Sequence, residues 1–398
     1  METIRIKSDK IIVGEGLVSG YVYFQDGKIT GVTSEDFSTE KSSGEKFSGE
    51  NFNLPYDLEY DRTGFYVAPG FIDIHTHGGR GCEFFGSAED VIGGCNFHLE
   101  HGTTSICPTI SAAPFQVMRE SVFRAREAKE SGKLRSNLIG LHMEGPYLSA
   151  EQCGGQCPDH ITPPRPEEYC DLIREAGDII ARWTYAPEND PEGTFCNYLT
   201  EHGVVASAGH TNAIYDDMKV AMENGCRLVT HLYSCTSTIT RKQGFRRLGV
   251  IETAYLRDDM YVEIIADGRH LPPELIQLIL KVKGTDKVAL VTDSLALAGT
   301  DVTHGVTLGT EFIIEDGVCK LMDRSAFAGS IATADRLIRV LTEEVGVSVP
   351  VAVKMMTRVP AEIMGLNKGS LEPGRDADII VFDENIQMKD LFVMGQKI

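Results

Sequence analysis

The sequence predicts an α/β protein made of a (β/α)8 barrel of the TIM type and a small discontinuous β-sandwich. Three observations predict this architecture. From residue 71 onward, short apolar runs alternate with helix-length patterns, which is typical of βα units around a parallel sheet. Eight such runs lie between residues 71 and 293, the number that a barrel of this type requires. Both ends of the 398-residue chain instead have the texture of short strands and turns.

The two ends of the chain are predicted to form the small domain together. Residues 3–33 alternate strand-like runs with turns, and Asp26-Gly27 is a hairpin signal. Residues 34–56 are rich in Ser, Glu, Lys and Gly, so we expect an exposed loop there. After residue 365 the β texture returns in "GSLEPGRDADIIVFD". The expected boundaries are 1–68 plus 366–398 for the sandwich domain and 69–365 for the barrel.

The barrel elements follow from the pattern of apolar residues. Helices are expected between several of the strands: "TNAIYDDMKVAMENG" has a capping-type Asn212 and a terminating Gly225. A later segment spaces Leu337, Leu341 and Val345 on one helical face. The candidate strands are 71–75, 103–109, 137–144, 181–187, 203–210, 227–232, 260–267 and 287–293.

Composition excludes several classes of partner. The formal net charge of −20 argues against nucleic acid and anionic membranes. The sequence contains no apolar run of about 18 residues, so no membrane span is expected. The charged N-terminus lacks the apolar core of a signal peptide, and a cytoplasmic location is therefore expected. Ten scattered cysteines suit the thiols of an intracellular enzyme. Only Cys153 and Cys157 lie close together, and their spacing fits no redox or zinc motif.

Polar residues gather at the predicted strand ends, where the active sites of such barrels lie. The first strand, in "PGFIDIHTHGG", ends with two histidines at i and i+2, which point to the same side of an extended segment. The histidine pair alone is better explained as polar residues of a loop, and each other strand-end residue alone is as well explained by a hydrogen-bonded core role, but their convergence favours a metal site. The converging groups are His75, His77, Glu144, His210, His231 and Asp293.

Histidine and carboxylate ligands suit zinc, iron or a similar divalent ion, and an open coordination position lowers the pKa of a bound water. A carboxylate beside that water can take its proton and return it to a leaving group, a role that Asp293 fits. The sequence thus predicts metal-assisted hydrolysis of an amide or another C–N bond. His142 is not expected to be a ligand, since its side chain would lie either in the core or behind the ligands, and His98 and His101 are expected to be ordinary residues near a helix C-terminus.

Motifs spread over nearly the whole chain resemble the amidohydrolase superfamily and, within it, the N-acetylglucosamine-6-phosphate deacetylases. They are "PGFIDIHTHGG", "LHMEGPYLS", "SAGHT", "THLYS", "ADGRH", "LVTDS", "FAGS" and "PGRDADIIVFD", specific in their order and spacing. The resemblance implies a barrel with a split β-sandwich, a homodimer, and removal of the acetyl group from an N-acetylamino sugar 6-phosphate, with N-acetylglucosamine 6-phosphate favoured.

The resemblance also implies roles for the strand-end residues. Glu144, His210 and His231 would hold the main metal ion, and His75 and His77 would help to hold a second ion bridged by the same glutamate. One or two divalent ions per subunit are therefore expected, with zinc favoured and iron or another divalent ion open. Asp293 would act as general base and then as general acid.

The substrate side is also expected from the resemblance. His270 would bind the sugar, and Gln156 stands where some relatives have a histidine near the acetyl group. Arg241 begins "RKQG" and would reach the phosphate in the neighbouring subunit. Ser234-Cys235 replaces the usual Asn-Ala pair, so the phosphate end departs from the family pattern. The sugar or phosphate pocket would be lined by Phe327, Ala328, Gly329 and Ser330.

Several alternatives stay open at the level of sequence. The substrate could be the galactosamine isomer or another N-acylated amino sugar. A different amidohydrolase, acting on a cyclic amide or an N-acyl amino acid, is disfavoured because the fourth strand has no lysine at its end. A metal-free binding relative would have lost ligands, and none is lost. The basic run from Arg241 to Arg247 could also be a solvated loop.

Overall fold

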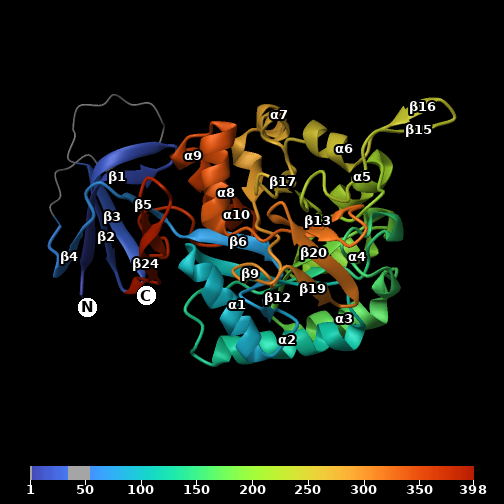
Figure 1. Cartoon of the computed structure of the whole chain (residues 1–398), viewed down its shortest axis with the longest axis horizontal. Coiled ribbons are helices and arrows are strands. Elements are labelled where there is room, and N and C mark those ends of the chain that lie inside the picture. Colours follow the sequence, from blue (N-terminus) through green and yellow to red (C-terminus); the bar gives the residue numbers. More distant parts are fainter. Residues whose placement is uncertain (1, 35–53) are drawn as a thin grey trace.

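A sheet built from both chain ends lies beside a barrel that holds the rest of the chain (Figure 1). The computed structural model describes residues 2–34 and 54–398. The predicted loop 34–56 therefore lies, apart from its two edges, outside the described residues. None of the helices in the described part of the chain is long and apolar enough to cross a bilayer.

The terminal strands form one continuously paired, eight-stranded mixed sheet in the order β25-β24-β23-β5-β1-β2-β3, with β4 beside β1. The predicted pairing of the two ends is confirmed, because β5 lies antiparallel to β23. The strands are β1 (Ile4–Val13), β2 (Gly16–Gln25), β3 (Lys28–Ser34), β4 (Leu58–Asp61), β5 (Tyr66–Pro69), β23 (Ile379–Phe382), β24 (Met388–Val393) and β25 (Gln396–Lys397).

The hairpin predicted at Asp26-Gly27 is confirmed. Both residues have positive φ, 51° and 76°, and they form the two-residue loop between β2 and β3. This conformation matches the right-handed twist of the flanking strands, which is why Asp-Gly is favoured there. The turn fixes the register of the sheet near the N-terminus.

The predicted barrel is confirmed, with all eight candidate strands in one parallel sheet in the order β6, β9, β11, β12, β13, β14, β17, β18. The predicted third strand is broken, and its first part, β10, lies beside β9. The strands are β6 (Phe71–Thr76), β9 (Thr103–Ser111), β10 (Asn137–Leu138), β11 (Leu141–Glu144), β12 (Ile180–Tyr185), β13 (Val205–Ala208), β14 (Leu228–Val229), β17 (Tyr261–Ile264) and β18 (Val288–Leu290).

The break in the third strand has a tertiary cause. Gly140 has a φ of 152°, and a Cβ at this position would lie 2.7 Å from the Cβ of Ala181 and 2.9 Å from the carbonyl oxygen of Ile179. The neighbouring strand therefore approaches so closely that only glycine fits, and the chain kinks between β10 and β11.

The first and last barrel strands meet at their carboxyl ends. The backbone N–H of Asp293 donates to the carbonyl of His75 over 2.9 Å, and the N–H of His77 donates to the carbonyl of Ser294 over 2.8 Å. The Thr76 hydroxyl also donates to the Ser294 carbonyl, over 3.4 Å. These bonds close the barrel at its rim, so the backbone of the predicted site residues is itself part of the seam.

Helices surround the barrel as the βα pattern predicts (Figure 1). Leu337, Leu341 and Val345 are buried together as expected, although a π-helical turn, Leu341–Val345, follows α8. The helices are α1 (Ala88–Glu100), α2 (Phe115–Glu130), α3 (Pro166–Ala176), α4 (Thr194–Glu201), α5 (Tyr215–Glu223), α6 (Val250–Leu256), α7 (Pro273–Lys283), α8 (Ala334–Val340), α9 (Val349–Met355) and α10 (Arg358–Ile363).

The predicted cap of α5 is wrong. The helix starts after Ile214, and Asn212 is not its cap. The side chain of Asn212 instead accepts a hydrogen bond from Gln152 over 2.7 Å and donates to Glu151 over 2.6 Å. The Asn212 side chain thus binds a loop distant in sequence instead of capping the helix. Gly225, with a φ of 101°, follows the helix end as expected.

Three β insertions at the carboxyl side of the barrel were not predicted. A four-stranded antiparallel sheet follows β18, and an antiparallel hairpin, β15–β16, projects from the barrel body (Figure 1). The inserted strands are β7 (Gly78–Gly79), β8 (Cys82–Glu83), β15 (Thr240–Lys242), β16 (Phe245–Arg247), β19 (His304–Thr307), β20 (Thr310–Glu315), β21 (Val318–Leu321) and β22 (Phe327–Gly329).

Candidate metal centre and its pocket

The first barrel strand presents the histidine pair to the barrel interior. Ile72 and Ile74 pack in an apolar cluster, while Asp73 and His75 alternate with them and point to the opposite side of β6. The Asp73 carboxylate accepts the backbone N–H of His75 over 3.2 Å, and burial raises the pKa of Asp73 to about 6. His77 follows the strand end and reaches the wall of a pocket.

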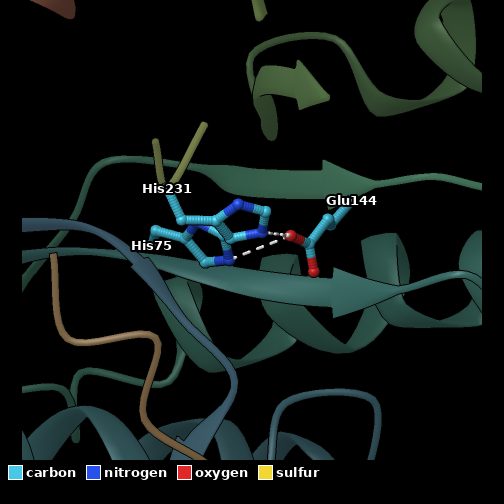
Figure 2. A group of neighbouring side chains, drawn as sticks. All are labelled: His75, Glu144 and His231. Atoms are coloured by element: carbon cyan, nitrogen blue, oxygen red, sulfur yellow. Dashed lines mark hydrogen bonds and ion pairs between the residues drawn. The ribbon is translucent and has the colours of Figure 1, made fainter. Parts of the chain in front are cut away.

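Glu144, the last residue of β11, meets four imidazoles, and Figure 2 shows two of them, His75 and His231. Its Oε1 lies 3.3 Å from Nε2 of His75, 3.2 Å from Nε2 of His210 and 3.0 Å from Nε2 of His231. Its Oε2 lies 3.2 Å from Nε2 of His77. Residues from the ends of β6, β11, β13 and β14 therefore converge on one carboxylate, as the strand-end prediction requires.

The orientation of His210 defines which of its nitrogens faces this carboxylate. The Nδ1–H donates to the carbonyl of Gln152 over 2.9 Å, which leaves the Nε2 lone pair directed at Glu144. The Nε2 atoms of His210 and His231 lie 3.1 Å apart. Acceptor atoms so close to one another need a proton or a cation between them, and this arrangement is typical of a metal site.

Asp293 completes the cluster from the end of the last strand. Its Oδ1 lies 3.2 Å from Nε2 of His77 and 3.4 Å from Nε2 of His75. Burial alone would raise the pKa of Asp293, but the adjacent histidines outweigh it and hold the pKa below its ordinary value. The carboxylate is therefore anionic at neutral pH, in the state that a proton acceptor requires.

His75 gives the clearest test of whether the cluster fits a metal ion. The ring is fully buried, and neither of its nitrogens has a hydrogen-bond partner. Burial opposes a charge on His75, yet the carboxylates of Glu144 and Asp293 raise its pKa to about 10. The surroundings thus favour positive charge at this point, and the imidazole and carboxylate donors are those that zinc and similar ions prefer.

Two groups of ligand atoms have the spacing of a metal site. His75, Glu144 and His231 form the first group, and His75, His77 and Asp293 form the second, with all ligand atoms of a group within 4.8 Å of one another. His210 faces the same oxygen of Glu144 as His231 does. The residues present therefore fit one or two divalent ions.

A cavity of about 280 Å³ opens over this cluster. The inserted sheet supplies one wall through Phe312 and Phe327, and the barrel rim supplies the other. His75 lies beneath the cavity. The predicted site residues that line it are His77, Glu144, Gln156, His210, His231, Ser234, Cys235, His270, Asp293, Phe327, Ala328 and Gly329.

The side-chain amide of Gln156 forms hydrogen bonds to other residues of the protein rather than pointing freely into the cavity. Its Nε2 donates to Oε2 of Glu144 over 2.7 Å, and its Oε1 accepts the backbone N–H of Ala112 over 2.8 Å. Both ends of the amide are therefore engaged, and Gln156 fixes the orientation of the central carboxylate.

His270 lies at the opposite wall, where its ring centroid is 4.9 Å from that of Phe327. Its Nδ1–H donates to Asp267 over 2.9 Å. In this tautomer the second ring nitrogen, Nε2, carries a lone pair and can accept a hydrogen bond from a hydroxyl group.

Two predicted substrate residues lie outside the cavity wall. Ser330 is fully buried: its hydroxyl donates to the carbonyl of Thr292, and its backbone N–H donates to the carbonyl of Asp293 over 2.9 Å. It supports the loop that carries Asp293. Arg241 lies on the exposed β15–β16 hairpin, away from the cavity of its own chain.

Ser234 and Cys235 do line the cavity, and the surrounding loop is shaped to admit the thiol. A Cβ on Gly154 would lie 2.5 Å from the Sγ of Cys235, so a glycine is needed in the facing "CGGQC" loop. All ten cysteines, including Cys153 and Cys157, are free thiols. The Cys235 side chain is thus accommodated by a glycine across the cavity.

Sequence reasoning missed the polar layer beneath the cluster. Arg182 and Glu263 form a fully buried ion pair inside the barrel. His142 bridges Thr109 and Thr184 over 3.1 Å and 2.7 Å, in keeping with its expected position in the core or behind the ligands. A charged residue within each of two predicted barrel strands, 181–187 and 260–267, was the available signal, because such positions are normally apolar.

His98 lies in the last turn of α1, as predicted, but its ring is fully buried, and its Nε2 lies 2.9 Å from the carbonyl of Gly78. Burial lowers its pKa to about 4. The ring therefore acts as a neutral donor that supports the loop after His77.

Known proteins match this chain along nearly its whole length. The model of the amidohydrolase family matches residues 66–397. N-acetylglucosamine-6-phosphate deacetylase of Bacillus subtilis is 31% identical over 396 residues, covering 97% of this chain and 95% of that protein. The corresponding protein of Haemophilus influenzae is 33% identical over 342 residues, covering 84% and 87%. The solved structure of the Pasteurella multocida deacetylase superposes with a TM-score of 0.87 at 28% identity, covering 100% of this chain and 99% of that one.

Proposed function

The chain belongs to the amidohydrolase family and, within it, to the N-acetylglucosamine-6-phosphate deacetylases, and from this premise we propose that it hydrolyses the acetamide of N-acetylglucosamine 6-phosphate to the amino sugar phosphate and acetate. One observation carries the proposal: the side chains from the barrel strand ends converge on Glu144 and Asp293 below a cavity that has room for a small molecule. This arrangement provides both ligands for an ion and a proton acceptor.

The ligand roles follow from the contacts. Glu144, His210 and His231 would hold the main ion, and His75 and His77 would hold a second ion with Glu144 between them. A bound divalent ion, for which zinc is the first candidate, would polarise the acetyl carbonyl and lower the pKa of the attacking water.

Asp293 would move the proton. Its anionic carboxylate can take a proton from the attacking water and return it to the amide nitrogen as the C–N bond breaks. The hydrogen bond from its backbone N–H to the carbonyl of His75, together with that from Ser330 to its own carbonyl, holds the group in place. Gln156 would act by orienting Glu144, since both ends of its amide are engaged there.

The sugar would lie between the cluster and the inserted sheet. His270 offers Nε2 to a sugar hydroxyl, and Phe327 provides an apolar face beside it. Ala328 and Gly329 add backbone groups along the same wall, and Ser330 would act indirectly through the Asp293 loop.

The phosphate end would be completed by a second copy of the chain. Ser234 and Cys235 reach the cavity and can offer a hydroxyl and backbone amides. Arg241 is exposed on the projecting hairpin (Figure 1), and within the described residues it has no ion-pair partner. We therefore propose a homodimer in which Arg241 of one subunit contacts the phosphate bound to the other.

Two further proposals concern organisation. The domain boundaries 1–68 plus 366–398 and 69–365 are supported by the core of the terminal sheet, in which the buried apolar residues end at Val67 and resume at Leu371. A cytoplasmic location is supported by ten free thiols, because reducing compartments keep cysteines in this state.

The decisive experiment is an assay of acetate release with the metal content measured alongside. We expect turnover of N-acetylglucosamine 6-phosphate and none of unphosphorylated N-acetylglucosamine. Preferential turnover of N-acetylgalactosamine 6-phosphate would move the assignment to the isomer. Absence of acetate release from every N-acetylhexosamine phosphate by metal-loaded protein would refute the proposal.

A further inference from the structure

We propose that the buried Arg182–Glu263 pair is a positioning device that holds His75 for the second metal ion. The inference rests on the proposed function, since it deepens the assignment of His75 as a ligand. Arg182 lies on β12 and Glu263 on β17, and both side chains have 0% exposure. Neither residue lines the cavity, so neither can touch a substrate there.

The pair contacts both the ring and the backbone of the first strand. Oε2 of Glu263 lies 3.6 Å from Nδ1 of His75, on the side of the ring opposite to Glu144 and Asp293. Arg182 donates to the carbonyl of Ile74, the residue before His75, over 3.0 Å. The two charges therefore act on the same short segment through independent contacts.

The arrangement selects one tautomer of His75. A carboxylate opposite Nδ1 favours a proton on that nitrogen, which leaves the Nε2 lone pair directed at the cluster. The distance of 3.6 Å exceeds that of a hydrogen bond, so in this structure the carboxylate faces the ring without bonding to it. A small movement of the ring would bring Nδ1–H within bonding distance of Glu263.

Arg182 keeps Glu263 charged and immobile. It binds both carboxylate oxygens, one of them over 2.9 Å, and its remaining N–H groups donate to the hydroxyls of Thr230 and Ser207 over 3.0 Å and 3.3–3.4 Å. The guanidinium is thus held from several strands at once. This fork of fixed donors defines the position of a carboxylate more closely than a single ammonium would.

A merely structural ion pair would behave differently from a positioning pair. Replacing both partners of a buried ion pair by apolar residues often preserves the fold, whereas removing one leaves an uncompensated charge. The informative variant is therefore the double substitution Arg182→Met with Glu263→Leu. It removes the carboxylate opposite His75 without leaving a lone charge.

The test is a Zn²⁺ titration of chelator-stripped protein, with chelator competition for affinity and mass spectrometry for stoichiometry. We expect wild-type protein to bind two ions. The double variant should bind the first ion as wild type does and the second at least tenfold more weakly, the effect usual for the outer partner of a metal-bound histidine. Arg182→Met with Glu263→Gln, which keeps an acceptor oxygen for Nδ1–H, should recover most of that loss.

A matched control removes a second ion pair that lies far from the cluster. Lys368 and Asp378 pair over 2.7 Å, with side-chain exposures of 9% and 3%. Lys368→Met with Asp378→Leu should leave both Zn²⁺ affinities unchanged. Unaltered binding of two ions by the Arg182→Met, Glu263→Leu variant would overturn the inference. A wild-type protein that binds only one ion would also overturn it, while leaving the proposed reaction standing.

Discussion

The two ends of the proposed site are built in opposite ways. At the rim of the barrel, Glu144 and His75 are buried and each faces several partners from different strands. On the β15–β16 hairpin every residue is exposed, including Phe245 with 76% exposure. Among the described residues, neither Arg241 nor Lys242 has an ion-pair partner. The reactive end of the proposed site is therefore formed within one chain, whereas the hairpin proposed to contact the phosphate is exposed in that chain.

Metal removal should have the largest effect, because it breaks the reactive end as a whole. We expect dialysis against a chelator to abolish acetate release and Zn²⁺ to restore it. The stripped protein should keep its helical circular dichroism, since the strands that carry the cluster are held by the barrel seam and by Gln156. Full turnover by protein shown to contain no metal would contradict the assignment of the cluster.

Substitution of the proton acceptor should have the next largest effect. In Asp293→Asn the side chain can no longer take a proton, so we expect kcat to fall by about 10²–10⁴-fold while the metal content is kept. Metal analysis and steady-state kinetics on the same preparation measure both quantities. Unchanged kcat in a metal-loaded variant would exclude Asp293 as the base.

Loss of Arg241 tests the phosphate end of the proposed site. In Arg241→Ala we expect KM to rise by about 10–100-fold with kcat nearly unchanged, as for the loss of a charge-assisted contact made equally in ground and transition states. Arg247→Ala is the matched control, since Arg247 pairs across the hairpin with Thr240, while Arg241 pairs with Arg246 and so faces the opposite side. Equal effects of the two substitutions on KM would mean that only the overall charge of the β15–β16 hairpin affects substrate binding.

The smallest expected effect concerns stability rather than activity. The pKa of His98 is about 4 in the folded chain and about 6.5 when unfolded. The unfolded chain therefore binds the proton more tightly, and the stabilisation present above pH 6.5 is lost as the pH falls towards 4, by up to about 3 kcal/mol. Urea unfolding at pH 7 and pH 4.5 should show this loss.

The corresponding variants isolate the contribution of that ring. His98→Gln should flatten the pH dependence because it removes the titrating group while keeping a donor near Gly78. His202→Gln, at an exposed position on the surface, should leave the dependence as it is. A pH dependence that survives His98→Gln would assign the acid lability to other groups.

The sequence predicted the structure best where a short local pattern decides the conformation. Asp26-Gly27 formed its hairpin, and the strand-end residues converged, because turn conformation and barrel topology follow from short patterns. The sequence-based predictions failed where contacts with a segment distant in the chain decide the local conformation. Gly140 breaks a strand because of a neighbouring strand, and Asn212 is taken by another loop. Arg182 was overlooked because its partner lies 81 residues further along the chain.

The seam of the barrel sets a limit on when the protein can become active during its synthesis. Thr76 and Ser294, whose bond helps to join the first and last strands, are separated by 218 positions. At about 5–20 residues per second, a ribosome needs more than ten seconds to pass from one to the other. Until then the nascent chain lacks Asp293, the proton acceptor of the proposed reaction, so hydrolysis by the proposed mechanism cannot precede the emergence of the last strand.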